Sequence, residues 1–163
     1  MDTYSQPSDA AGTLQGLATS YKTQLSAAAS NTTRLCRGKI VEIGVGPFSN
    51  PAATDCNIVF CVQRMTAAGT GSAVTPVPVK PAESGSSPAA VSTWLANMTV
   101  EGTYANSIWR RPLNQHSGFH WYAPDDLGLP WPAINGAGLA CTAKGADAAA
   151  NALTVLWDVK FNE

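Results

Sequence analysis

Two histidines followed by an acidic pair are the residues that come closest to a metal or acid–base site. His116 and His120 are four positions apart, and Asp125 and Asp126 follow them. Imidazoles and carboxylates are common metal ligands and proton carriers. On an extended strand, positions 116 and 120 face the same side but lie about 13 Å apart, which is too far for both to bind one ion. We therefore expect the histidines to lie on a polar outer or interface face. We expect the two aspartates to lie in a loop, where their side chains face solvent or cap backbone groups of the loop.

The glycine-rich segment Ala67–Ser72 is the nearest match to a phosphate-binding loop. It lacks the Gly-Lys-Ser/Thr ending of a P-loop, and no helical pattern follows it. No serine lies in a Gly-x-Ser-x-Gly context, and neither histidine has an identifiable triad partner. The sequence thus predicts no catalytic, cofactor-binding or metal-binding residues, and a protein that is not an enzyme.

Aromatic and arginine residues offer binding chemistry instead. Trp131, in the segment Leu-Pro-Trp-Pro, and Tyr122 have rings that stack on sugars or on a partner protein when they are exposed. The alternative is that such loop aromatics are tucked over the open end of the fold. The only basic doublet, Arg110-Arg111, is too small to bind nucleic acid but suits a protein interface.

The four cysteines, at positions 36, 56, 61 and 141, match neither paired zinc knuckles nor a dense disulfide framework. Cys61 and Cys141 fall inside apolar, strand-like runs, where a free thiol behaves as a small hydrophobic group. We predict buried thiols, in preference to one disulfide or a metal site.

The composition excludes several classes of protein. Of the 163 residues only 13% are charged, and the net charge is −1, so the chain lacks the basic footprint of a nucleic-acid-binding protein. No apolar run approaches the roughly 18 residues that a membrane span needs. The first residues contain neither a basic region nor an apolar run, so we expect no signal peptide and synthesis in a cytoplasm.

Strands account for most of the periodicity in the chain. In the last segment, Leu153, Val155, Trp157, Val159 and Phe161 occupy every second position, a pattern typical of a half-buried strand. Residues 66–90 contain too many Gly and Pro residues for a helix and predict a long loop with one short edge strand near 74–79. The other predicted strands cover residues 21–28, 39–45, 57–65, 93–100, 103–110, 115–122 and 138–143.

Short strands separated by Gly/Pro turns predict an all-β fold, an antiparallel sandwich or barrel. Residues 1–20 are small and polar, so we expect an extended N-terminal arm outside the core, with residues 21–163 as a single β-sandwich domain. The segment Asn57–Val62 is apolar on both faces, which suits a strand whose second side is covered by a partner subunit.

The segment Val62–Pro76 (VQRMTAAGTGSAVTP) resembles small virion structural proteins of tailed bacteriophages, of the capsid decoration (cement) type. The likeness continues through Lys39–Gly44, Pro112–Gln115, Phe119–Tyr122 and the closing strand, and spans residues 22–163. The Leu-Pro-Trp-Pro loop and the four cysteines depart from it.

The resemblance implies a jelly-roll-like β-sandwich that decorates and stabilises the capsid exterior. Its partners would be the shell of major capsid protein and further copies of itself, in a homo-oligomer that the resemblance favours as a trimer, made in the bacterial host cytoplasm. Two other interpretations stay open at this point. One is a tail, baseplate or fibre component, and the other is a carbohydrate-binding module that uses Trp131 and Tyr122.

Overall fold

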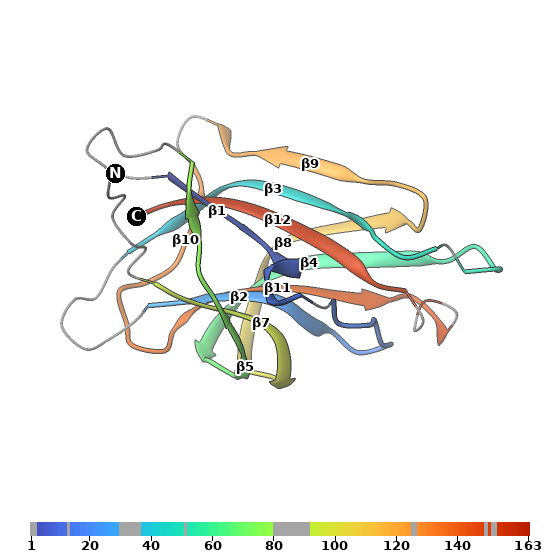
Figure 1. Cartoon of the computed structure of the whole chain (residues 1–163), viewed down its shortest axis with the longest axis horizontal. Helices are drawn as coiled ribbons and strands as arrows, with labels where there is room; N and C mark the ends of the chain where they lie inside the picture. Colours follow the sequence, from blue (N-terminus) through green and yellow to red (C-terminus); the bar gives the residue numbers. More distant parts are fainter. Residues whose placement is uncertain are drawn as a thin grey trace.

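The structure, a computed structural model, describes residues 3–12, 14–29, 37–50, 52–79, 92–124, 127–148, 150 and 153–163. Within these residues the fold is two antiparallel β-sheets that pack face to face, without an α-helix (Figure 1). The predicted all-β antiparallel sandwich is therefore confirmed.

Each sheet is assembled from segments that are distant in the chain. The first sheet has the order β10-β3-β12-β1-β6, and β9 also pairs with β3; the second has the order β5-β7-β2-β11-β4-β8. The strands of the first sheet are β1 (Thr3–Pro7), β3 (Lys39–Pro47), β6 (Val77–Pro78), β9 (Phe119–Tyr122), β10 (Leu129–Pro130) and β12 (Val155–Asn162). Those of the second sheet are β2 (Lys22–Ala28), β4 (Asn57–Ala67), β5 (Thr70–Val74), β7 (Thr93–Val100), β8 (Thr103–Asn114) and β11 (Gly138–Gly145).

The pairing follows the jelly-roll pattern. β1 pairs with β12, β2 with β11, β3 with β9, and β4 with β8, so that the early half of the chain pairs in nested order with the late half. The first and third of these pairs lie in one sheet, and the second and fourth lie in the other. This is a long hairpin rolled into two sheets, with β5 and β7 added beside β2.

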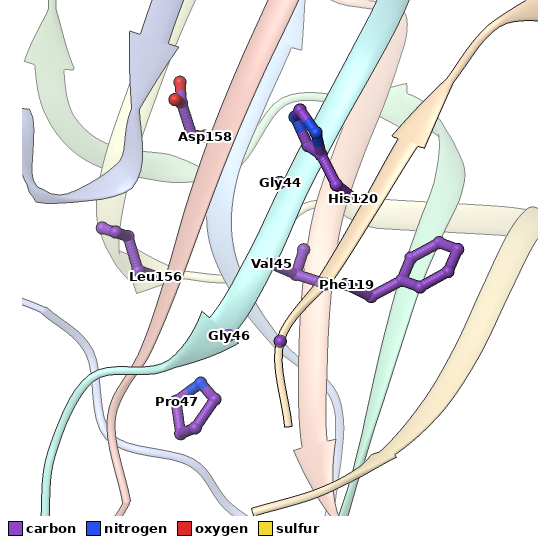
Figure 2. Close-up of a pocket in the computed structure, with 9 residues that line it drawn as sticks. Gly44, Val45, Gly46, Pro47, Phe119, His120, Leu156 and Asp158 are labelled. Carbon is purple, nitrogen blue, oxygen red and sulfur yellow. The ribbon is translucent and has the colours of Figure 1, made fainter. Parts of the chain in front are cut away.

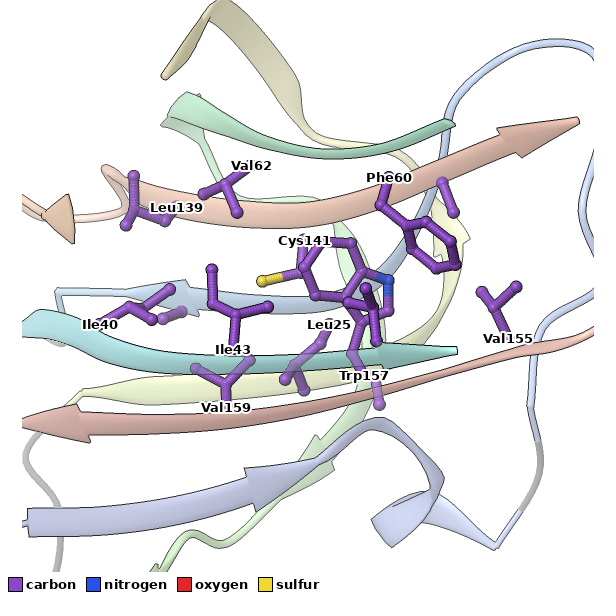
Figure 3. Packing of buried hydrophobic residues seen from close by; sticks show 14 of the residues in the cluster. Leu25, Ile40, Ile43, Phe60, Val62, Leu139, Cys141, Val155, Trp157 and Val159 are labelled. Atoms are coloured by element: carbon purple, nitrogen blue, oxygen red, sulfur yellow. The ribbon is translucent and has the colours of Figure 1, made fainter. Parts of the chain in front are cut away.

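The core lies between the sheets and is built by alternation along each strand. In β12, Val155, Trp157 and Val159 are fully buried and face Phe60 and Val62 of β4 across the sandwich (Figure 3). The ring of Trp157 packs edge-on against that of Phe60, with 5.6 Å between centroids. The period-2 pattern of residues 153–161 therefore predicted both the strand and its buried face.

The prediction of an N-terminal arm is wrong. β1 lies inside the first sheet, hydrogen-bonded to β12 along its length and to β6 on its other side (Figure 1, dark blue beside red). Tyr4 and Gln6 alternate with half-buried neighbours and are 2% and 1% exposed, and the following 3-10 turn η1 (Ser8–Ala11) buries Ser8. The described residues of this segment, 3–12 and 14–20, therefore do not form a unit apart from the sandwich. The sequence concealed this because Tyr4 is the single large apolar residue in a five-residue strand.

The chain itself covers part of the outer face of Asn57–Val62, for which a partner subunit was expected. Cys61 faces the outer side of the second sheet, yet it is fully buried, and its Sγ donates to Ser107 Oγ at 3.1 Å. Beside it, Ala28, Met65 and Ala140 form a small buried cluster on which Tyr104 packs. The register of β4 and β8 shifts by bulges from Val62 onward, in the same part of the sheet as this buried cluster.

The loop predicted over residues 66–90 is wrong in part, because β5 (Thr70–Val74) is a strand there that pairs with β7. Two other strand predictions hold with altered bounds. The short edge strand expected near 74–79 occurs as β6, at the edge of the first sheet as its proline requires. β8 is longer than predicted and runs to Asn114 through Pro112, which an edge strand tolerates because one side of the strand is open.

Candidate functional site

A shallow groove of about 470 Å³ runs along the outer face of the first sheet. Its floor is β3, where the inward-facing Ile43 and Val45 alternate with the outward-facing Gly44 and Gly46. Because these outward positions carry no side chain, the sheet is hollowed there. Gly118, which precedes β9, extends the same hollow.

Side chains of the neighbouring strands form the walls of this groove. His120 of β9 and Asp158 of β12 stand on either side of Gly44, and Leu156 continues the wall on the β12 side (Figure 2). A Cβ placed at Gly44 would lie 3.4 Å from His120 Cδ2, so the walls are close together. The groove is mostly apolar, with an imidazole and a carboxylate at its rim.

An ion network at one end of the groove holds His120 in place. Glu42 accepts hydrogen bonds from Lys160 Nζ at 2.8 and 2.9 Å, and its Oε1 lies 2.8 Å from His120 Nε2. The hydrogen bond to the Glu42 carboxylate raises the pKa of Lys160. The ring of Tyr122 packs edge-on against His120 at 4.4 Å. The contact of His120 with Glu42 links β9 to β3, and the imidazole ring of His120 lines the wall of the groove.

The other histidine lies apart from this network. His116, in the turn before β9, contacts Asp55 with 3.3 Å between Nε2 and Oδ1, and both side chains are exposed. The two histidines thus contact different carboxylates. The strand predicted over 115–122 covers only Phe119–Tyr122, so the spacing argument, which placed both histidines on one strand, does not apply to His116. Within the described ranges no group of three or more His, Cys, Asp or Glu side chains is placed to hold a metal ion. Asp125 and Asp126 lie outside the described residues.

The glycine-rich segment Ala67–Ser72 has a packing role. It crosses from β4 to β5, where Gly71 lies so close to the paired strand β7 that a Cβ on it would meet the Ala96 carbonyl oxygen at 2.7 Å. A Cβ on Gly69 would overlap the carbonyl oxygen of Val100. Glycine is required here because two backbone segments touch. This close approach accounts for the glycines without a phosphate.

Of the two candidate aromatics, the structure buries one and exposes the other. Trp131 is 1% exposed, its backbone N–H donates to Gly38 at 3.0 Å, and its ring packs against Trp94 and Phe161. Trp131 therefore closes the open end of the sandwich, and its proposed role in stacking on a sugar is wrong. Tyr122 is 63% exposed beside the groove.

The arginine doublet and the cysteines are in ordinary structural surroundings. The Arg111 guanidinium lies 4.2 Å from the centroid of the Phe119 ring, and Arg110 reaches Ser107 Oγ at 3.5 Å. The thiols at positions 56, 61 and 141 are free and buried, as predicted, while Cys36 lies outside the described residues. Burial raises the pKa of the Cys56 and Cys141 thiols, which makes them poor nucleophiles.

Sequence reasoning found His120 but missed its partners. Glu42 and Lys160 occupy outward positions of two predicted strands, so the alternation predicted that both side chains face outward. The alternation did not predict that they touch each other, because this contact depends on the register in which Lys160 of β12 lies opposite Glu42 of β3.

Comparisons with known proteins add no relative. No protein-family model matches the chain, and neither does any curated protein or any solved structure. None of the described residues forms a helix long and apolar enough to cross a membrane.

Proposed function

We propose that the protein is a non-enzymatic structural subunit of a tailed-bacteriophage virion. In this role it decorates and stabilises the capsid exterior by binding the shell of major capsid protein as a homo-oligomer. The resemblance that suggests this is carried first by residues 62–76, within a likeness that spans 22–163. In residues 62–76, Gly69 and Gly71 lie in close contact with the backbone of β7. The segment forms the end of β4, the glycine crossing and β5. The proposal is therefore supported by one observation: the segment that resembles the virion proteins forms part of the β-sandwich framework, at the crossing from β4 to β5.

The surface of the sandwich supports a binding role. The outer face of the first sheet carries the paired charges Glu42 and Lys160 and the shallow glycine groove. A surface with few unpaired charges costs little to desolvate when another protein covers it. Large apolar side chains are also exposed, among them Val77, Tyr122 and Ile134 at 60% or more.

The edge strands suit assembly through many small contacts. Among the described residues β8 pairs only with β4, so its other edge is open to a neighbour. The residues Arg110, Arg111 and Pro112 occupy the later part of this edge, and such residues discourage indiscriminate strand pairing. A capsid lattice multiplies weak contacts through avidity, so no single interface needs to be large.

Immunogold labelling of virions from the phage that encodes the protein tests the assignment. We expect gold over the head, at a copy number that scales with the capsid lattice. Gold confined to the tail would instead favour the tail, baseplate or fibre alternative. Virions that carry no label although the protein is present in infected cells would contradict both. Light scattering coupled to size-exclusion chromatography separately tests for the trimer.

A further inference from the structure

Two adjoining hollows lie at the end of the sandwich that Trp131 closes. One, of about 240 Å³, is lined by Arg37, Arg64 and the Pro-Trp-Pro segment. The other, of about 270 Å³, is lined by Met65, Ala105, Ile134 and Ala137 among others. Arg64 and Pro132 line both, so the two hollows adjoin; together they are called here the Arg64 groove.

The strand register explains why an arginine stands at this place. Arg64 of β4 lies opposite Leu139 of β11, which is a core residue, so both occupy the inward side of the second sheet. The preceding inward residues of β4, Phe60 and Val62, are fully buried, whereas Arg64 is exposed. The core therefore ends at Val62, and the guanidinium stands at the open end of the sandwich.

The charge of Arg64 is not compensated within the described part of the chain. No carboxylate there forms an ion pair with it, whereas Lys160 is paired with Glu42, and Lys144 lies over the ring of Tyr21. Arg37 lines the same hollow. A guanidinium binds a carboxylate through two parallel hydrogen bonds, and such pairs gain strength beside apolar surface.

The other half of the groove is apolar and open. Ile134 is 60% exposed beside the buried Met65 and Ala137. An exposed isoleucine over an apolar hollow gains free energy when another apolar group covers it. The groove therefore presents a positive charge and an apolar trough side by side.

We propose that the Arg64 groove binds an acidic, apolar segment of a partner protein. An Asp or Glu carboxylate of that segment pairs with Arg64, and a neighbouring aliphatic side chain covers Ile134 beside Met65. Charge complementarity and the adjoining trough select this occupant. The inference stands apart from the virion assignment, because it concerns the chemistry of the segment and not the identity of the protein that carries it.

A titration followed by nuclear magnetic resonance tests this on the full chain. The probe is the blocked peptide acetyl-Gly-Leu-Asp-Leu-Gly-amide, and the matched control replaces Asp by Asn. We expect saturable shifts of the Arg64 Nε–H, the Met65 methyl and the Ile134 methyl signals with the Asp peptide. Affinity for the Asn peptide should be at least about tenfold lower, since a charge-assisted bond is lost.

Two variants separate the groove from general charge effects. Arg64→Gln should reduce affinity for the Asp peptide at least about tenfold and remove the preference for Asp over Asn. Arg110→Gln, which removes an exposed arginine outside the groove lining, should leave both unchanged. Equal affinity of the wild type for the two peptides, shifts confined to other surfaces, or an unaltered Arg64→Gln variant would each overturn the proposal.

Discussion

Among single residues, a polar trio on the second sheet makes the closest set of contacts. Tyr104 O–H donates to Glu101 Oε2 at 2.6 Å, and Thr23 Oγ1 hydrogen-bonds both Glu101, at 2.5 Å, and the Tyr104 hydroxyl. The Gly102 N–H donates to the Tyr104 oxygen at 3.0 Å. These bonds tie β2 to the turn between β7 and β8. Burial and the bond to Glu101 raise the pKa of Tyr104 from 10.0 to about 12.

This raised pKa predicts a loss of stability at high pH. The folded protein holds the Tyr104 proton more tightly than the unfolded chain, so the stabilisation is complete below pH 10 and is lost as the pH rises towards 12. We expect Tyr104→Phe to be less stable than the wild type by about 1 kcal/mol at pH 9, with the difference narrowing by pH 11.5. Urea unfolding of both proteins across this range measures it. A difference that stays constant with pH would contradict this titration.

Glycine 138 gives a second test at this scale. A Cβ on Gly138 would overlap the carbonyl oxygen of Ala27 on the paired strand β2. Backbone cannot move aside as a flexible side chain does, so Gly138→Ala should lower the free energy of unfolding by about 2 kcal/mol or more.

Gly46→Ala is the matched control, because the nearest atom to its added Cβ is Gly118 Cα at 3.6 Å. Thermal unfolding of the two variants should show a clear fall in midpoint for Gly138→Ala and little change for Gly46→Ala. Similar midpoints for both would show that β11 and β2 are farther apart than described here.

At the scale of elements, β1 has the largest consequence for the fold. It lies between β12 and β6, so it completes the first sheet instead of projecting from it. Its Tyr4 ring stacks on Phe161 of β12 with 5.3 Å between centroids, and that ring in turn packs against Trp94 and Trp131. The first strand therefore anchors the aromatic end of the core.

Replacing Tyr4 by Ala tests this placement. We expect Tyr4→Ala to lower the free energy of unfolding by about 3 kcal/mol, the usual cost of removing a buried aromatic ring. Ser5→Ala, at the adjacent outward-facing position, should change it by no more than about 0.5 kcal/mol. Chemical denaturation measures both. Equal, small effects would restore the interpretation of residues 1–20 as an arm.

At the scale of the whole molecule, the nested pairing joins the two ends of the chain. Thr3 lies opposite Asn162, and the remaining pairs nest within this outermost one. Long loops must close, at a cost in entropy, before such contacts can stabilise the fold, so folds rich in non-local contacts form slowly. Because both sheets share one core, neither should persist without the other.

We therefore expect single-step unfolding and slow refolding, on a timescale of milliseconds to seconds. Stopped-flow refolding followed by tryptophan fluorescence reports on the core, since Trp94, Trp131 and Trp157 are all buried there. Equilibrium transitions by fluorescence and by far-ultraviolet circular dichroism should coincide. Separate transitions would mean that the sheets unfold independently.

The sequence by itself determined most of the long strands and which side of each faces the core, whereas β1, β5 and β10 were not predicted as strands. Residues 93–100 became β7 with the predicted bounds, and the alternation in 153–161 identified the buried face of β12. These features are local, because the direction of a side chain along a strand repeats every two residues. The burial of Cys61 and Cys141 followed from the same local patterns.

Only the tertiary structure decided which strands lie side by side. The pairing of β1 with β12, the contact of Glu42 with His120 and Lys160, and the position of Arg64 at the open end of the core all depend on it. The backbone groups that join strands are the same in every strand, so they do not specify a partner. The pairing partner and the register of a strand are set by how side chains far apart in the chain fill one shared core. The sequence of a single strand does not contain that information.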